Sequence, residues 1–130
     1  MKKMLKMNYL IIITLTNYSV YYMLRDELLA KLSENTSVLV VFITATWCAP
    51  CQTIKPYIMD KFRDTEYEYL CLDVDADADC YAALKSKKQF KGVPTLLGYI
   101  KGNSTLNADI SISGTNINEI DCFFESLCFL

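Results

Sequence analysis

The sequence contains no histidine among its 130 residues, and only four glycines and three prolines. Without histidine, the Ser-His-Asp and Cys-His arrangements, in which an imidazole activates a nucleophile, are excluded. There is no glycine-rich phosphate-binding loop, so we expect no flavin, nicotinamide or other nucleotide cofactor. Charges of both signs are interspersed around a net charge of −2, which argues against nucleic-acid binding.

The length and the cysteine content limit the class of protein further. A chain of 130 residues is long enough for one domain with a substantial core. Six cysteines are typical of a secreted disulfide framework, but such frameworks are usually smaller and less hydrophobic than this chain. We therefore expect a cytoplasmic monomer with one redox-active cysteine pair and four ordinary thiols.

The redox-active pair is predicted to be Cys48 and Cys51. These cysteines stand where an apolar run, residues 38–43, gives way to a segment with helical character, residues 52–63. A thiol at a helix N-terminus faces unpaired N–H groups and the positive end of the helix dipole, which favour the reactive thiolate. Pro50 suits an early helical position because its missing N–H has no partner to lose there.

Two other interpretations of this pair remain open. Two cysteines three residues apart can form half of a zinc site, or can simply be buried core residues. A zinc site needs two more ligands, and this chain has no histidine and no second Cys-x-x-Cys motif. We therefore expect no metal at this pair.

The N-terminal segment has two interpretations. Residues 7–24 carry no charge and follow a lysine-rich start, which is the outline of a signal peptide or membrane anchor. Polar residues shorten its apolar core, and no clear cleavage site follows. The favoured alternative is a strand over residues 9–16 and a helix from Asn17 or Ser19 to about Leu32. On that helix Leu24, Leu28 and Leu32 share one face.

Strands and helices alternate along the rest of the chain. Strands are predicted at 38–43, 68–74, 95–100 and 106–113, and helices at 48–63, 80–89 and 116–128. In the last helix an apolar face is predicted from Ile117, Ile120, Phe124 and Leu127. Cys122 and Cys128 lie about 9 Å apart along this helix, too far for a disulfide, and are interpreted as structural.

Four aspartates alternate at positions 73, 75, 77 and 79. Oxygen ligands at this spacing resemble a calcium-binding loop, but the glycine and the distal glutamate of that loop are missing. We therefore favour a solvated turn that caps the following helix.

Several motifs together resemble the thioredoxin family, in the right order and at roughly the right spacing from about residue 9 to residue 128. They are Ala45-Thr46-Trp47-Cys48-Ala49-Pro50-Cys51, Ile54-Lys55-Pro56, Val74-Asp75-Ala76-Asp77, Gly92-Val93-Pro94-Thr95-Leu96, Lys101-Gly102 and Ser113-Gly114. The resemblance implies an α/β thioredoxin fold, a central mixed sheet with helices on both faces. It places an N-terminal extension at 1–8 and the domain at 9–130.

The resemblance also implies a function and a set of site residues. The expected activity is the reduction of protein disulfides, with Cys48 attacking and Cys51 resolving the mixed disulfide. No cofactor is expected beyond this pair, which a reductase or another dithiol must recharge. The Val93–Pro94 bond is expected to be cis, leaving the Val93 backbone free to pair with an extended substrate. The expected substrate-binding residues are Trp47, Ala49, Pro50, Val93, Pro94 and Gly114.

The chain departs from the family pattern beside the second cysteine. The family usually has a buried aspartate five residues before the tryptophan and a lysine on the next strand. These positions are Phe42 and Cys71 here. Ala49 replaces a commoner glycine, and Gln52 a frequent basic residue. Two alternatives stay open: a binding module with weak redox chemistry, or a disulfide oxidase or isomerase of a secretory compartment.

Overall fold

The computed structural model describes residues 23–130. The strand expected at 9–16, the signal or anchor interpretation of residues 7–24 and the domain boundary at residue 8 therefore lie wholly or mainly outside the described residues. No helix within residues 23–130 is long and apolar enough to cross a membrane.

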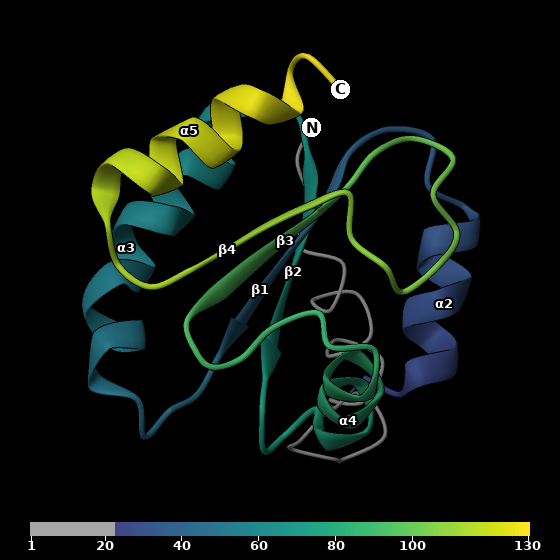
Figure 1. The fold of residues 1–130 in the computed structure, drawn as a ribbon, viewed down its shortest axis with the longest axis horizontal. Helices are drawn as coiled ribbons and strands as arrows, with labels where there is room; N and C mark the ends of the chain where they lie inside the picture. The colour runs from purple at the N-terminus through teal and green to yellow at the C-terminus, as the bar shows by residue number, and fades with distance from the viewer. Residues whose placement is uncertain (1–22) are drawn as a thin grey trace, which may run out of the picture.

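The described chain is a four-stranded mixed sheet with helices on both faces, as expected (Figure 1). The strand order is β2-β1-β3-β4, with β1 parallel to β2, and β3 antiparallel to both β1 and β4. The elements are α2 (Arg25–Ser33), β1 (Leu39–Thr44), α3 (Ala49–Asp64), β2 (Glu68–Asp73), α4 (Ala78–Ser86), β3 (Thr95–Tyr99), β4 (Ile110–Ser113) and α5 (Ile117–Leu127).

The central strand β1 leads directly to the cysteine pair. All six of its residues, Leu39–Thr44, are buried, which matches its continuous apolar sequence and its place between two neighbouring strands. Phe42 lies opposite Cys71 of β2 and Leu96 of β3. The chain leaves β1 at Thr44 and enters α3 at Ala49, so the pair stands at the end of the central strand.

Each face of the sheet has its own apolar core. Helices α2 and α4 cover one face, where Leu28, Leu32 and Leu84 pack with Val41 and Ile43. Helices α3 and α5 cover the other face (Figure 1). The core of this second face comprises Val40, Phe42, Ile54, Ile58, Phe62, Cys71, Leu96, Ile120, Phe123, Phe124 and Leu127.

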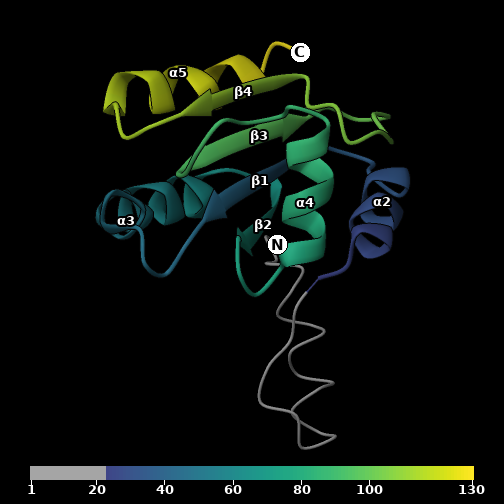
Figure 2. The ribbon, with the colours of Figure 1, turned by 60° about the horizontal axis from the view of Figure 1, so that its bottom comes forward.

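Helix α5 runs alongside the edge strand β4 (Figure 2). Gly98 of β3 makes this close approach possible, because a Cβ atom there would lie 2.8 Å from Leu127 Cδ2 and 3.0 Å from Ile110 Cγ1. The predicted apolar face of this helix is wrong at one end. Ile117 is 41% exposed, and Phe123 is buried instead, because Ile117 is the first helical residue.

The start of the first described helix was also predicted wrongly. The helix begins at Arg25, and Leu24 is its N-cap with 47% of its surface exposed, so Leu24 does not share the buried face of Leu28 and Leu32. The Glu27 carboxylate accepts a hydrogen bond from the Leu24 N–H at 3.4 Å. This contact supplies an acceptor for one of the backbone N–H groups at the helix start.

Strand β4 is shorter than the predicted strand at 106–113, and a loop precedes it. Polar side chains in this loop bind nearby backbone groups. Asn103 Oδ1 accepts the Thr105 N–H at 3.0 Å, Asn103 Nδ2 donates to the Asn107 carbonyl at 2.8 Å, and Asp109 Oδ2 accepts the Ile100 N–H at 2.8 Å. Such local bonds compete with a strand ladder, which therefore begins only at Ile110.

Candidate active site

Cys48 is the N-cap residue of α3 and forms a disulfide with Cys51. Its Sγ accepts a hydrogen bond from the Cys51 N–H at 3.2 Å, which is one of the N–H groups that the helix itself leaves unpaired. Pro50 stands in the first turn, as predicted. When the pair is reduced, the same N–H and the helix dipole favour a thiolate on Cys48.

The two sulfurs differ in their access to solvent. Cys48 keeps 7% of its surface exposed, whereas Cys51 is fully enclosed. Ala49 and Pro50, between them, are exposed. An incoming disulfide can therefore reach Cys48 first, and Cys51 can only attack a sulfur already bound to Cys48.

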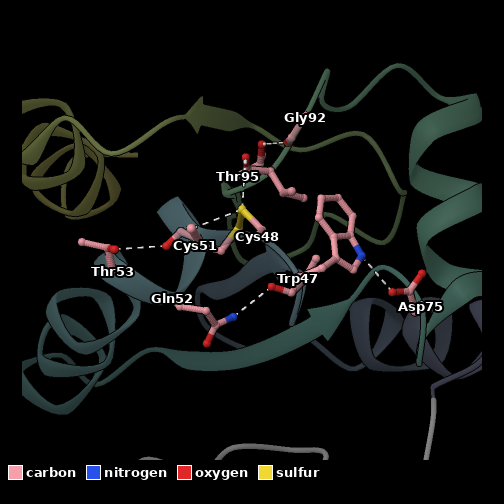
Figure 3. The surroundings of a disulfide bond; sticks show 11 residues. Trp47, Cys48, Cys51, Gln52, Thr53, Asp75, Gly92 and Thr95 are labelled. Atoms are coloured by element: carbon pink, nitrogen blue, oxygen red, sulfur yellow. Dashed lines mark hydrogen bonds between the residues drawn. A yellow bond between two sulfur atoms is a disulfide. The ribbon is translucent and has the colours of Figure 1, made fainter.

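Trp47 extends from the loop before α3, with 67% of its surface exposed. Its indole N–H donates to Asp75 Oδ2 at 2.9 Å (Figure 3). Asp73 Oδ1 in turn accepts the N–H groups of Asp75 and Ala76 at 2.8 and 3.0 Å, which fixes the turn that carries Asp75. The sequence did not assign Asp75 this role, although an exposed tryptophan N–H commonly finds an acceptor.

The other side of the site is the segment before β3. The Val93–Pro94 bond is cis, as the resemblance implied. The Val93 carbonyl oxygen lies 3.9 Å from Cys48 Sγ. The Thr95 hydroxyl lies 2.6 Å from both the Gly92 carbonyl oxygen and the Ser113 hydroxyl, and the first of these contacts is drawn in Figure 3. These contacts fix the backbone next to the accessible sulfur.

Gly114 joins this segment from the end of β4. Its N–H donates to the Pro94 carbonyl at 2.9 Å, and its φ of 103° lies in the region that favours glycine. Gly114 and Trp47 are exposed and Val93 is half-buried, whereas Pro94 is buried. Five of the predicted substrate-binding residues thus reach the surface, whereas Pro94 is buried and its carbonyl binds Gly114.

The region of the missing carboxylate is apolar. Phe42 is fully buried and lies opposite Cys71, a cysteine outside the disulfide with 7% of its surface exposed. The one polar side chain there that sequence reasoning missed is Thr44, two residues along β1. It is buried, and its hydroxyl has no hydrogen-bond partner among residues 23–130. No carboxylate replaces the family's aspartate at this position.

Gln52 also departs from the family pattern. Its Nε2 donates to the Ala45 carbonyl at 2.9 Å and so ties the first turn of α3 to the loop before it. A neutral amide therefore stabilises the loop geometry where a basic side chain would have added positive charge near Cys48.

The alternating aspartates at positions 73, 75, 77 and 79 differ in their surroundings. The described residues contain no group of three or more Asp, Glu, Cys or His side chains placed to hold a metal ion. The expectation of a wholly solvated turn is wrong for Asp77, which is fully buried. Asp77 accepts the Met23 N–H at 2.6 Å and the Asp73 N–H at 2.8 Å.

The four remaining cysteines form no disulfide within residues 23–130, as expected. Cys71 and Cys80 are buried, whereas Cys122 and Cys128 are exposed, and the last two are not joined to each other, as expected. The Tyr67 hydroxyl lies 3.0 Å from Cys128 Sγ. Burial and the neighbouring thiol raise the pKa of Tyr67 to about 12.

Comparisons with known proteins agree on one family. The family model "Thioredoxin" matches residues 19–121. The curated protein "Thioredoxin 3" of Plasmodium falciparum (isolate 3D7) is 31% identical over 96 residues, which are 74% of this chain and 51% of that protein. "Thioredoxin H-type" of Chlamydomonas reinhardtii is 36% identical over 77 residues, 59% of this chain and 66% of that protein.

Solved thioredoxin structures share the fold of this chain. The thioredoxin of Trichomonas vaginalis superimposes with a TM-score of 0.69 at 20% identity, covering 82% of this chain and 93% of that one. A thioredoxin mutant from Halobacterium salinarum gives 0.63 at 27% identity, covering 83% and 88%. The chain spans about half to two thirds of the length of the two curated relatives above. The family model covers most of the chain, and the chain therefore belongs to the thioredoxin family.

Proposed function

We propose that this protein is a thiol–disulfide oxidoreductase that reduces protein disulfides through Cys48 and Cys51. The observation that carries the proposal is the disulfide at the start of α3, with one sulfur partly exposed and the other enclosed. The Val93 carbonyl beside Cys48 offers a hydrogen-bond acceptor to an extended substrate. The proposed substrate-binding surface comprises Trp47, Ala49, Pro50, Val93, Pro94 and Gly114.

The reaction proceeds in two exchanges. The Cys48 thiolate attacks one sulfur of the substrate disulfide and forms a mixed disulfide, while the other substrate sulfur leaves as a thiolate. The Cys51 thiolate then attacks Cys48 Sγ, closes the Cys48–Cys51 bond and releases the second substrate thiolate. Two electrons pass to the substrate, whose two thiolates take up the two protons that the cysteines lost.

The second exchange proceeds here without the family's carboxylate. Phe42 cannot accept the proton of Cys51, so water or the departing substrate thiolate takes it. We therefore expect release of the reduced substrate to be slower than formation of the mixed disulfide. A reductase or a second dithiol of the cell returns the pair to its reduced form.

The test is reduction of insulin with dithiothreitol as the source of electrons. Cys48→Ser abolishes turnover, and Cys51→Ser accumulates a mixed disulfide that mass spectrometry locates on Cys48. Cys122→Ser is the matched control, because Cys122 is an exposed thiol outside the pair, and it keeps the rate of the unmodified protein. Turnover by the Cys48→Ser variant would contradict the proposal.

The Phe42 site favours one second candidate, a binding module with slow redox chemistry. In that case the variant with both Cys48 and Cys51 changed to serine would still capture its partner, and the insulin assay would give no rate above that of dithiothreitol alone. An oxidase or isomerase is distinguished by the reduction potential of the Cys48/Cys51 pair, which would lie above that of the glutathione pool.

We place the protein in the cytoplasm as a monomer. Four cysteines in the described residues form no disulfide, which is compatible with a reducing compartment, where exposed thiols such as Cys122 and Cys128 persist. Equilibration of the Cys48/Cys51 pair with glutathione tests this location. A potential more reducing than the cytoplasmic glutathione pool supports it, and a mature N-terminus near residue 25 would contradict it.

A further inference from the structure

Positive charge is concentrated on one part of the chain. Between Cys80 and Ala108 there are five lysines and neither an aspartate nor a glutamate. Four of these lysines, at positions 85, 87, 88 and 91, fall within seven residues, and all four are exposed. We call these four residues the lysine rim. The segment just before it, residues 73–79, has four aspartates and no basic residue.

One member of the lysine rim, Lys91, lies close to the active site. Lys91 stands two residues before Val93, whose carbonyl oxygen is 3.9 Å from Cys48 Sγ. Since consecutive Cα atoms are about 3.8 Å apart, the Cα atoms of Lys91 and Val93 lie within about 8 Å of each other. Lys85 and Lys87 lie at the end of α4, from which the chain enters this segment.

The loop after α4, which carries Lys87, Lys88 and Lys91, is held in place by side-chain contacts. The Gln89 side chain accepts the Ala108 N–H at 2.7 Å and donates to Asn107 Oδ1 at 3.2 Å. Phe90 is buried, and its ring centroid lies 5.3 Å from that of Tyr81. The positive charges therefore stand on a fixed loop, and little conformational freedom is lost when a partner meets them.

Lys88 occupies a position where a lysine is costly. Its N–H donates to the Lys85 carbonyl at 2.9 Å and the Gln89 N–H donates to the Leu84 carbonyl at 3.1 Å, the pattern that closes a helix with a left-handed residue. Lys88 is that residue, with a φ of 56°, and glycine is the usual choice there. The helix dipole accounts for lysines in the last turn of α4, but not for Lys91 beyond it.

We propose that the lysine rim is a docking surface for acidic segments, and that the substrates are proteins with acidic residues beside the reactive disulfide. This inference rests on the proposed function and names its substrate class. Asp75 accepts the Trp47 indole N–H, so its carboxylate stands beside the site and repels a second acidic segment there. We therefore expect the substrate's acidic residues to lie near Lys91, on the segment that leads to Val93.

Charge placed beside the site acts mainly on the rate of encounter. The test uses two peptides that each contain one internal disulfide, with three glutamates beside it in one and three serines in the other. At low ionic strength we expect kcat/KM for the glutamate peptide to exceed that for the serine peptide about fivefold. The ratio falls toward one in 0.5 M salt, because salt screens exposed charges.

The variant Lys91→Glu removes the preference for the glutamate peptide and leaves the rate with the serine peptide unchanged, which also shows that the variant is folded. Lys101→Glu is the matched control, because it makes the same change in charge at an exposed residue beyond the other end of β3. The inference is overturned if wild type shows no preference, or if Lys101→Glu lowers it as much as Lys91→Glu. If wild type reduces neither peptide, the proposed function fails as well.

Discussion

The two faces of the sheet are stabilised in different ways. The face covered by α3 and α5 is apolar and aromatic: the Phe62 ring stacks on Tyr69 with centroids 4.2 Å apart and meets the edge of Phe124 at 5.7 Å. The face covered by α2 and α4 includes Asp77, the one fully buried carboxylate in the described residues. This carboxylate joins the start of α2 to the turn after β2 through the Met23 and Asp73 N–H groups.

The difference shows that a buried carboxylate has different consequences on the two faces. The family's aspartate would stand at Phe42, on the aromatic face. In this chain Phe42 contributes only to core packing. The buried carboxylate of Asp77, on the opposite face, binds backbone N–H groups and so stabilises the fold. The buried carboxylate of this chain therefore serves stability, and substitutions at Phe42 and at Asp77 can be examined separately.

The largest effect is expected from placing a carboxylate on the aromatic face. Phe42→Asp removes a fully buried ring and leaves a charge opposite Cys71 without a partner. We expect it to lower the free energy of unfolding by at least about 4 kcal/mol, measured by urea denaturation of the oxidised protein. In folded variant protein, a carboxylate there should speed the release of reduced substrate from the mixed disulfide, measured in single-turnover experiments.

Two further variants separate charge from volume at Phe42. Phe42→Leu keeps the site apolar and should cost less than half as much as Phe42→Asp. Adding Cys71→Lys to Phe42→Asp supplies the family's basic partner and should recover part of the loss. If Phe42→Asp were as stable as Phe42→Leu, the aromatic face would accommodate an unpaired carboxylate, contrary to our expectation.

On the opposite face, removal of the buried carboxylate is expected to be the next most costly change. Asp77→Ala leaves the Met23 and Asp73 N–H groups without this acceptor and should lower the free energy of unfolding by about 3 kcal/mol. Asp75→Ala is the matched control, because Asp75 is exposed and loses a single bond to the Trp47 indole. Equal effects of the two substitutions would show that burial does not distinguish them.

A smaller effect of opposite sign is expected at the end of α4. Lys88→Gly removes the cost of a left-handed lysine, partly offset by the greater freedom of glycine in the unfolded chain. We expect a gain of about 0.5–1 kcal/mol in a urea melt. Lys87→Gly, one residue earlier with a φ of −87°, should be destabilising instead. A gain from both substitutions would argue against strain at Lys88.

The sequence predicted the elements and the cysteine pair because these depend on local patterns. The continuous apolar run of β1 and the placement of Pro50 after Cys48 are both visible in the printed residues. The extent of β4 was not predictable, because Asn103 and Asp109 bind backbone groups that only the folded loop brings close. Asp77 was predicted to be solvent-exposed because its partner Met23 is 54 residues away in the sequence, and only the fold brings the two together.

The smallest effect concerns a charged link at the margin of the aromatic face. The Tyr57 hydroxyl of α3 donates to Asp121 Oδ1 of α5 at 2.5 Å, and Lys61 Nζ lies 2.9 Å from the same oxygen. The Tyr57 hydrogen bond, and then Lys61, lower the pKa of Asp121 below its ordinary 3.8. The ionised carboxylate therefore stabilises the fold at neutral pH, and this contribution is lost as the pH falls through the lowered pKa.

Asp121→Asn should accordingly reduce stability at pH 7, and the difference from the unmodified protein should narrow only below about pH 4. We expect a modest change, because a third of the Asp121 side chain is exposed and water screens its charge. Thermal melts between pH 2.5 and pH 7 measure it. In a Tyr57→Phe background the difference should shrink at neutral pH, because the main cause of the lowered pKa is gone. An unchanged difference would mean that Lys61 alone holds the carboxylate, and that the two helices are joined by charge and not by the hydroxyl.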